Sequence, residues 1–324
     1  MKRAMLLILL MLCVCLCGCR GPDAPSSPAD EKKRIVVGFS QVGAESDWRA
    51  ANTLSMQRAL CAENGYRLIL DDAQQKQEKQ ITALRNFVNQ GVDYIVLAPT
   101  TEQGWETVLQ EVKAAGIPVI IVDRMIEVSD TSLFTCWIGS DFRREGDTAA
   151  AWLDRQFGSR PLSIVHLQGN IGSSAQIGRT EGLNAALESH PAWQVVFREA
   201  GDFIQAKGQE LVEEVLKKGI AFDVIYAEND NMAYGAAEAL KKAGLAPGKD
   251  VTIVSFDASS TALHMILEGE ISYDVECNPL HGPRVRAIIE QLEKGETPPK
   301  YTFVEETAFE RSGLKEETIR VRGY

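Results

Sequence analysis

The fold is decided by the stretch Val36-Val37-Gly38-Phe39-Ser40-Gln41-Val42-Gly43-Ala44-Glu45-Ser46-Asp47-Trp48-Arg49. The apolar run at residues 35–39 predicts a buried strand, and residues 40–47 are small, polar and glycine-containing, as in loops. Apolar positions then recur with helical spacing over residues 48–60, before Gly65. The stretch therefore predicts a strand, a loop and the start of a helix, the corner of an open α/β sheet at which ligands bind.

The loop carries side chains that suit a ligand with many hydroxyl groups. Glu45 and Arg49 can hydrogen-bond hydroxyls, and Trp48 can stack on an apolar ring face, a combination that suits a sugar. The alternative is that Glu45, Ser46 and Asp47 only cap the following helix and that Trp48 packs on the core. The rest of the chain has to decide between these two interpretations.

A strand–helix alternation continues through the chain. The apolar runs do not alternate with polar residues, so both faces of each sheet should be covered by helices, as in parallel sheets. Two such series, separated by an irregular stretch at 125–133, predict an α/β protein with two similar Rossmann-like lobes. The predicted strands are 35–39, 66–70, 93–98, 117–122, 134–139, 162–167, 194–197, 224–227, 252–256, 271–275 and 301–304. The predicted helices are 48–60, 77–89, 102–115, 143–157, 175–189, 206–218, 232–243, 258–267 and 283–293.

Polar side chains follow the carboxyl ends of several predicted strands, which is where ligands lie in parallel sheets. Each of these side chains alone would be interpreted as a helix cap or a surface ion pair. Together, planar carboxylate, amide and guanidinium groups can each bond two adjacent hydroxyls, and their charge strengthens the bonds. We therefore favour one shared site for a polyol over independent caps. Beyond the first loop, these residues are Asp123, Arg124, Arg179, Glu228, Asn229, Asp230 and Asp257.

Composition limits the classes of function. The 324 residues are 45% hydrophobic and 24% charged, as in soluble globular proteins, and the length allows one large or two modest domains. A formal net charge of -11 argues against non-specific attraction to nucleic acid. No phosphate-binding loop and no nucleophile-elbow serine follows a strand, and the four histidines do not cluster. We expect a binding protein rather than an enzyme, without a metal or cofactor.

The N-terminal residues have the composition of an export signal. Lys2 and Arg3 precede an apolar segment at 4–16 that is too short for a comfortable membrane span. Its end, Leu16-Cys17-Gly18-Cys19, resembles the lipobox of bacterial lipoproteins, which implies lipidation of Cys19 after cleavage. The alternative is an ordinary secretory signal. We expect a lipoprotein signal peptide at 1–19 and a flexible tether at 20–34.

The chain resembles the type I periplasmic sugar-binding proteins of ABC transporters, and among them those that bind galactofuranose. The resemblance extends from Ile35 to the C-terminus. It is carried by Gly38-Phe39-Ser40-Gln41-Val42-Gly43, Asp72-Ala73-Gln74-Gln75-Lys76-Gln77-Glu78, Val96-Leu97-Ala98-Pro99, Ala114-Ala115-Gly116-Ile117-Pro118-Val119, Leu167-Gln168-Gly169, Gly201-Asp202-Phe203, Ala206-Lys207-Gly208, Tyr226-Ala227-Glu228-Asn229-Asp230 and Pro247-Gly248-Lys249-Asp250.

The resemblance implies two lobes joined by three crossover segments, near Gly139, Cys277 and Phe303, that close on a monosaccharide. The implied N-terminal lobe comprises 35–138 plus 278–303, and the C-terminal lobe 139–277 plus 304–324. Asp47 stands where the galactofuranose-binding relative has glycine, which puts galactofuranose in question more than pentoses or hexoses in general. The implied sugar contacts are Glu45, Ser46, Asp47, Trp48, Arg49, Asp123, Arg124, Arg179, Asn229 and Asp257.

The implied function is that of an exported substrate-binding lipoprotein, expected to be a monomer. It would deliver galactofuranose, galactose or a related pentose or hexose to ABC permease and ATPase subunits. The alternative is a sugar sensor that presents its ligand to a chemoreceptor or sensor kinase. A repressor with this fold would need an N-terminal helix-turn-helix, where this chain has a leader and tether. Cys136 and Cys277 lie near predicted crossovers, where they are either a disulfide or, as isolated cysteines usually are, buried free thiols.

Overall fold

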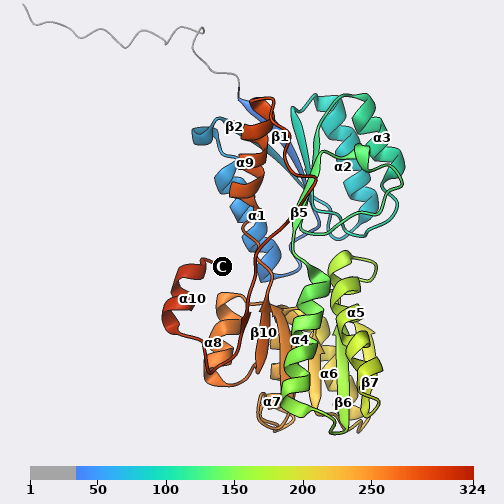
Figure 1. The fold of residues 1–324 in the computed structure, drawn as a ribbon, viewed down its shortest axis with the longest axis vertical. Helices are drawn as coiled ribbons and strands as arrows, with labels where there is room; N and C mark the ends of the chain where they lie inside the picture. The colour runs from blue at the N-terminus through green and yellow to red at the C-terminus, as the bar shows by residue number, and fades with distance from the viewer. Residues whose placement is uncertain (1–33) are drawn as a thin grey trace, which may run out of the picture. The chain divides into compact units, whose positions relative to one another are not determined.

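The structure is a computed structural model that describes residues 34–324. Two six-stranded sheets form its framework (Figure 1). The first sheet contains, in spatial order, β11 (Tyr301–Phe303), β5 (Cys136–Gly139), β4 (Val119–Val122), β3 (Tyr94–Leu97), β1 (Ile35–Gln41) and β2 (Tyr66–Asp72). The second contains β12 (Ala308–Phe309), β10 (Tyr273–Glu276), β9 (Thr252–Asp257), β8 (Val224–Ala227), β6 (Leu162–Gln168) and β7 (Trp193–Ala200). All neighbouring strands run parallel, except that β10 and β12 are antiparallel.

Helices cover both faces of the first sheet because its strands are apolar on both sides. On one face, α1 (Asp47–Ala59) and α9 (His281–Glu293) place Met56 and Ile289 against Val37 and Phe39. On the other, α2 (Gln77–Gln90) and α3 (Glu106–Ala114) place Leu84 and Leu109 against Ile95. Figure 1 shows α2 and α3 together on one side of this sheet.

The second sheet is covered in the same way. On one face lie α4 (Phe142–Phe157) and α5 (Ser174–Ser189), which pack on Val224 and Tyr226 of β8. On the opposite face lie α6 (Gln205–Lys217), α7 (Asp230–Lys242) and α8 (Ser260–Glu268), which pack on Ile225 and Ala227. The short α10 (Glu316–Arg322) contacts α8. Within residues 34–324 no helix combines the length and the apolar character that crossing a membrane requires.

The predicted α/β class with parallel sheets is confirmed, with local differences. The helix predicted from residue 102 begins only at Glu106, because the preceding residues form a turn with Gly104 at a φ of +92°. The tryptophan before the helix, Trp105, donates its indole N–H to the carbonyl of Thr101 and so stabilises that turn. The two-residue strand β12 and the polar helix α10 were not predicted, since neither has a usable apolar period.

The chain passes between the two sheets at three places. These are the junctions of β5 with α4, of β10 with α9, and of β11 with β12. In both sheets the parallel strands then end in loops that lead to a common cavity, described below. Cys136 and Cys277 are both buried, and both are free thiols in the structure.

Candidate ligand-binding site

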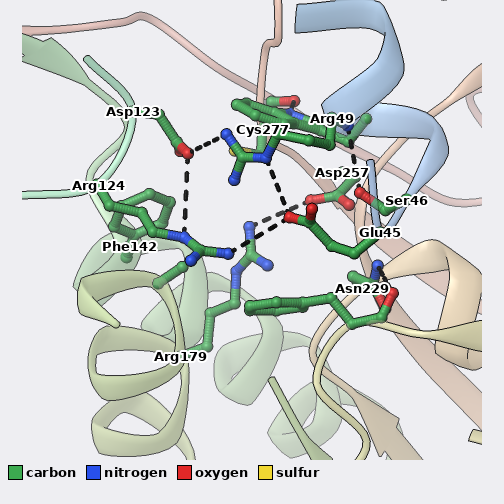
Figure 2. A pocket seen from close by; sticks show the side chains of 13 residues that line it. Glu45, Ser46, Arg49, Asp123, Arg124, Phe142, Arg179, Asn229, Asp257 and Cys277 are labelled. Carbon is green, nitrogen blue, oxygen red and sulfur yellow. Dashed lines mark hydrogen bonds and ion pairs between the residues drawn. The ribbon is translucent and has the colours of Figure 1, made fainter. Parts of the chain in front are cut away.

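A cavity lies between the carboxyl ends of the strands of the two sheets. About 290 Å³ of empty space, part of it open to solvent, lies among its side chains. Figure 2 shows carboxylates and guanidinium groups pointing toward one another across it. Its lining residues are Glu45, Ser46, Trp48, Arg49, Asp123, Arg124, Phe142, Ala175, Arg179, Phe203, Asn229, Asp257 and Cys277.

Side chains from the first sheet form a buried ionic group in the cavity wall (Figure 2). Arg49 donates from Nη1 to Asp123 Oδ2 at 2.8 Å and from Nε to Glu45 Oε1 at 3.0 Å. The Arg49 side chain is only 3% exposed. Burial lowers the pKa of Arg49, but Asp123 and Glu45 outweigh that effect and raise it above its ordinary value. Arg49 is therefore charged, and it fixes the two carboxylates in the wall.

Two polar groups in this wall are left available for a ligand. Arg124 donates from Nη1 to the Thr100 carbonyl, whereas its Nε and Nη2 lie 4.0 Å from Asp123 and 3.8 Å from Glu45, too far for hydrogen bonds. Burial and the neighbouring Arg49 lower the pKa of Arg124 to about 10, so it stays charged at neutral pH. Glu45 Oε2 is buried without a hydrogen-bond partner among residues 34–324. The unpaired Glu45 oxygen needs a hydrogen-bond donor, and the free N–H groups of Arg124 need acceptors. A ligand hydroxyl can act as either.

Arg179 is the centre of the opposite wall, which the second sheet supplies. It donates from Nε to Glu145 Oε2 at 2.7 Å, from Nη2 to Asp257 Oδ1 at 3.3 Å, and from Nη1 to the carbonyl of Glu228. Burial raises the pKa of Asp257 well above the ordinary value, and Arg179 opposes this. One guanidinium therefore orders two carboxyl groups beside the cavity.

Two lining residues also cap helices, so the capping interpretation of the sequence holds for them in part. Ser46 accepts a hydrogen bond from Arg49 N at 3.2 Å as the N-cap of α1. Asn229 accepts from Met232 N at 3.0 Å as the N-cap of α7, and its amide nitrogen donates to the Phe203 carbonyl. Because both residues also line the cavity, capping fixes them at its edge.

Aromatic rings form the apolar part of the wall. Trp48 is buried and donates its indole N–H to the Cys277 carbonyl at 2.7 Å. Phe142 and Phe203 line the cavity as well, and the guanidinium carbons of Arg179 and Arg124 lie 5.5 Å and 5.2 Å from their respective ring centres. These rings offer faces on which the apolar side of a small ring compound can pack.

Unusual backbone geometry coincides with the lining residues. Asp123, Phe203 and Asp257 have φ values of +63°, +64° and +106°, a region that costs energy for residues other than glycine. Close approaches hold two of them in place. A Cβ on Gly139 would lie 2.2 Å from the Asp123 carbonyl oxygen, and one on Gly169 would lie 1.9 Å from the Phe203 ring. Such strain at several cavity residues is typical of functional sites.

The structure brings together nine of the ten predicted site residues, and Asp47 is the exception. Asp47 is exposed at the start of α1, and its backbone N–H donates to Asn231 Oδ1 at 3.0 Å. Phe142, Ala175, Phe203 and Cys277 line the cavity but were not predicted. Phe203 lies in the loop after β7, which runs to Ala200, three residues beyond the predicted strand end at Phe197, so the strand-end pattern did not include it.

Residues 37–281 match the family described as the periplasmic binding protein domain. The chain belongs to the periplasmic binding protein family. This periplasmic binding protein is 39% identical over 287 residues to the galactofuranose-binding protein YtfQ of Escherichia coli, covering 87% of this chain and 90% of that protein.

Solved structures give the same picture for this periplasmic binding protein. One neighbour is a protein of Mycobacterium smegmatis in complex with β-D-fucofuranose, with a TM-score of 0.83, 38% identity and coverage of 89% and 97% of the two chains. Another is the binding component of the arabinose ABC transporter of Shewanella sp. ANA-3, bound to α- and β-L-arabinofuranose. Its TM-score is 0.82 at 39% identity, covering 89% and 94%.

Hydrogen bonds join the loops of the two sheets around the cavity of this periplasmic binding protein. Met125 N donates to Ser174 Oγ at 2.8 Å, and Glu102 N donates to the Gly172 carbonyl at 2.9 Å. Together with the bond from Asp47 N to Asn231, these contacts connect loops after β1, β3 and β4 with the starts of α5 and α7. These bonds hold the loops of the two sheets together around the cavity.

Proposed function

We propose that this protein binds a monosaccharide between its two lobes and delivers it to an ABC importer. The observation that carries the proposal is the convergence of charged planar groups from both sheets on one small cavity with aromatic walls. Charged donors and acceptors of this kind bond the hydroxyls of a sugar, and the rings pack against its C–H face. None of these groups forms a nucleophile–base pair with a neighbour, which favours binding over turnover.

The furanose ring form is the ligand class that we propose. The Escherichia coli relative is a galactofuranose-binding protein. The Mycobacterium smegmatis and Shewanella structures contain β-D-fucofuranose and L-arabinofuranose, respectively. These three sugars share a five-membered ring but differ in their exocyclic groups. In our proposal, the ionic groups around Arg49, Arg124 and Arg179 bind the five-membered ring. The other residues of the wall then determine which of these sugars is preferred.

Ring form can be tested directly with sugars labelled with ¹³C at the anomeric carbon. The purified protein is titrated calorimetrically with D-galactose, D-fucose and L-arabinose, and the bound sugar is then examined by NMR. We expect at least one of them to bind, to show the anomeric shift of a furanose, and to be recovered chemically unchanged. A bound pyranose would refute the ring assignment, and the absence of binding by any monosaccharide would refute the proposed function.

We propose that closure uses two lobes, residues 35–138 plus 278–303 and residues 139–277 plus 304–324. The three passages between the sheets support this division, since they fall at its boundaries. A ligand that bonds groups on both lobes stabilises the closed arrangement relative to an open one, and its affinity depends on how easily the lobes close. The permease would then recognise the closed form.

Ser174→Ala tests this closure mechanism away from the ligand. The substitution removes the hydroxyl that accepts from Met125 N across the cavity mouth, while Ser173, the N-cap of α5, stays in place. Loss of one such bond, about 0.5–1.5 kcal/mol, should weaken sugar affinity by roughly 2- to 10-fold. Calorimetry measures the change, with Ser189→Ala at the other end of α5 as the control. Equal affinities of the two variants would contradict a role for this contact in closure.

We further propose that the protein is exported and anchored through a lipid on Cys19, and that it acts as a monomer. Cys19 lies outside the described residues, so the proposal rests on the Leu16-Cys17-Gly18-Cys19 sequence and on the family. An anchor would keep the binding protein close to its permease and raise the effective concentration of loaded protein there.

Cys19→Ala is expected to release the protein from the membrane. In cells that make the full chain, the wild type should sediment with membranes and incorporate labelled fatty acid, and the variant should do neither. Cys17→Ala is the matched control, because it changes the neighbouring cysteine and leaves the proposed acceptor in place. Membrane attachment of the Cys19 variant at the wild-type level would exclude this anchor.

A further inference from the structure

Polar side chains gather where the three connecting segments run side by side. Ser140 follows β5, Cys277 follows β10 and Glu306 lies between β11 and β12. Ser140 Oγ donates to Glu306 Oε1 at 2.7 Å and lies 3.3 Å from Cys277 Sγ. The backbone N–H of Asn278 also donates to Glu306 Oε1, at 2.6 Å. The three segments are thus tied together around one thiol and one carboxyl group.

Glu145, in the first turn of α4, completes this group. One carboxylate oxygen of Glu145, the sulfur of Cys277 and one carboxylate oxygen of Glu306 lie within 4.8 Å of one another. Glu145 is 3% exposed and Cys277 is 2% exposed. Glu145 Oε2 accepts from Arg179, but Glu145 Oε1 is buried and has no hydrogen-bond partner among residues 34–324. An unpaired buried carboxylate oxygen therefore lies in a cluster that already holds two other potential metal ligands.

Little positive charge reaches this cluster: Arg179 lies beside Glu145, and the partly buried Arg284 interacts with Glu306. Arg179 is shared between Glu145 and Asp257, so it cannot neutralise the remaining groups. Burial raises the pKa of Glu145 to about 7 and that of Glu306 to about 8, and repulsion between the two carboxyl groups adds to the second shift. Burial likewise raises the pKa of the Cys277 thiol.

We propose that Glu145, Cys277 and Glu306 form a binding site for a divalent transition-metal ion with the ligand preference of zinc. One thiolate and two carboxylates are ligands that Zn²⁺ accepts, and three protein ligands leave a fourth position for water. With Zn–O and Zn–S bonds of about 2.1 and 2.3 Å, tetrahedral ligand atoms are roughly 3.4–3.6 Å apart. The ligand atoms lie within 4.8 Å of one another, so they would have to move closer together around an ion.

A groove gives an ion access to the cluster from outside the sugar cavity. About 1,020 Å³ of empty space, part of it open to solvent, lies beside α4 and β10, and Glu145 and Glu306 both line it. Asp141, Arg144 and Glu276 also line the groove, and Glu276 pairs with Arg322 at 3.0 Å.

The position of the site gives the ion a consequence for the whole protein. It would join α4 and two of the connecting segments, which must change their conformation when the lobes open and close. It would also withdraw negative charge from Glu145 while Glu145 Oε2 remains on Arg179, leaving Arg179 a stronger donor for the sugar cavity. Metal and sugar binding should therefore be coupled, and each should change the affinity for the other by the same factor.

Co²⁺ is the probe for the site, because a thiolate ligand gives an absorption band that carboxylates alone do not give. The purified, reduced full-length protein is titrated with Co²⁺ at about pH 8 without sugar, and Zn²⁺ is then added as competitor. We expect a thiolate-to-cobalt band at one equivalent, displaced by Zn²⁺. Cys277→Ser should remove the band and weaken Zn²⁺ binding by at least about 100-fold. Cys136→Ser, at another buried free thiol, should leave both unchanged.

Glu306→Gln is a second test of the site in case the Cys277 variant fails to fold. This variant keeps the Cys277 thiol and nearly the same side-chain volume at position 306. It should retain the sugar affinity measured without metal and weaken Zn²⁺ binding at least about 10-fold. The proposal is overturned if the wild type gives no thiolate band, or if Zn²⁺ binds equally to the wild type and to Cys277→Ser. Sugar titration of metal-free protein is a separate measurement, so failure of the metal site leaves the proposed sugar binding untouched.

Discussion

Asp123→Asn is expected to reduce sugar affinity at least about 30-fold while the protein remains folded. Asp123 accepts from Arg49 at 2.8 Å and faces Arg124 at 4.0 Å, so its charge organises both guanidinium groups in the first wall. Removing one partner of a buried charge pair costs about 2–5 kcal/mol, and each 1.4 kcal/mol is tenfold in affinity. Calorimetry with the sugar identified above measures the loss.

The fold should tolerate this change because asparagine is one of the few residues that adopt a positive φ readily. Asp123 has a φ of +63°, and its backbone N–H donates to the Ile138 carbonyl at 2.9 Å, which asparagine preserves. Asp202→Asn is the matched control, since Asp202 has a φ of +52° but pairs with Lys207 and does not line the cavity. If Asp123→Asn binds sugar as tightly as the control does, the charge at Asp123 has no role in recognition.

The strand-end pattern could be predicted from sequence because it depends only on topology. In a parallel sheet every strand delivers its following residues to the same edge. Asp123 after β4 therefore had to lie near the first loop, and Asp257 at the end of β9 near Asn229 after β8, if each series formed one sheet. The apolar runs were long enough to place those strands within a few residues. That the edges of the two sheets share one site was inferred from the similar chemistry of their side chains and from the resemblance to a two-lobed family.

The finer structure of the site depends on contacts that no local pattern encodes. Phe142, Ala175 and Phe203 are apolar residues, so their types do not distinguish a cavity wall from the core. Glu145 lies in the first turn of α4, just after the chain passes from the first sheet to the second. It interacts at 2.7 Å with Arg179, which is 34 residues later in the sequence. In the sequence it is one of several charged residues in an amphipathic helix, and only the packing of α4 on α5 makes it a partner of the site.

Arg179→Met is expected to abolish measurable sugar binding and also to destabilise the fold. Arg179 is 2% exposed and neutralises Glu145 and Asp257, which would both be left buried without a cation. Breaking a buried ion pair on one side costs about 3–5 kcal/mol, which corresponds to a decrease in Tm of roughly 6–15 °C. Differential scanning calorimetry and sugar titration measure the two effects separately. A variant with wild-type Tm and affinity would contradict the central position assigned to Arg179.

The destabilisation should depend on pH with a definite sign. Burial raises the pKa of folded Glu145 to about 7, above the ordinary 4.5, so its contribution to stability is greatest below about pH 4.5 and is lost as the pH rises through 7. Arg179 lowers the pKa values of Glu145 and Asp257, so its removal raises them further. The difference in Tm between the wild type and Arg179→Met should therefore narrow from about pH 7.5 to about pH 5. A gap that widens in acid would refute this explanation.

The double variant Arg179→Met, Glu145→Gln separates the structural role of Arg179 from its role in binding. Glutamine removes one of the two uncompensated charges, so the double variant should regain part of the lost stability at neutral pH. It should not regain sugar affinity, because the guanidinium that lines the cavity is still absent. If affinity returned together with stability, Arg179 would act only by holding the wall in place. If stability did not return, Glu145 would not be the group that Arg179 neutralises.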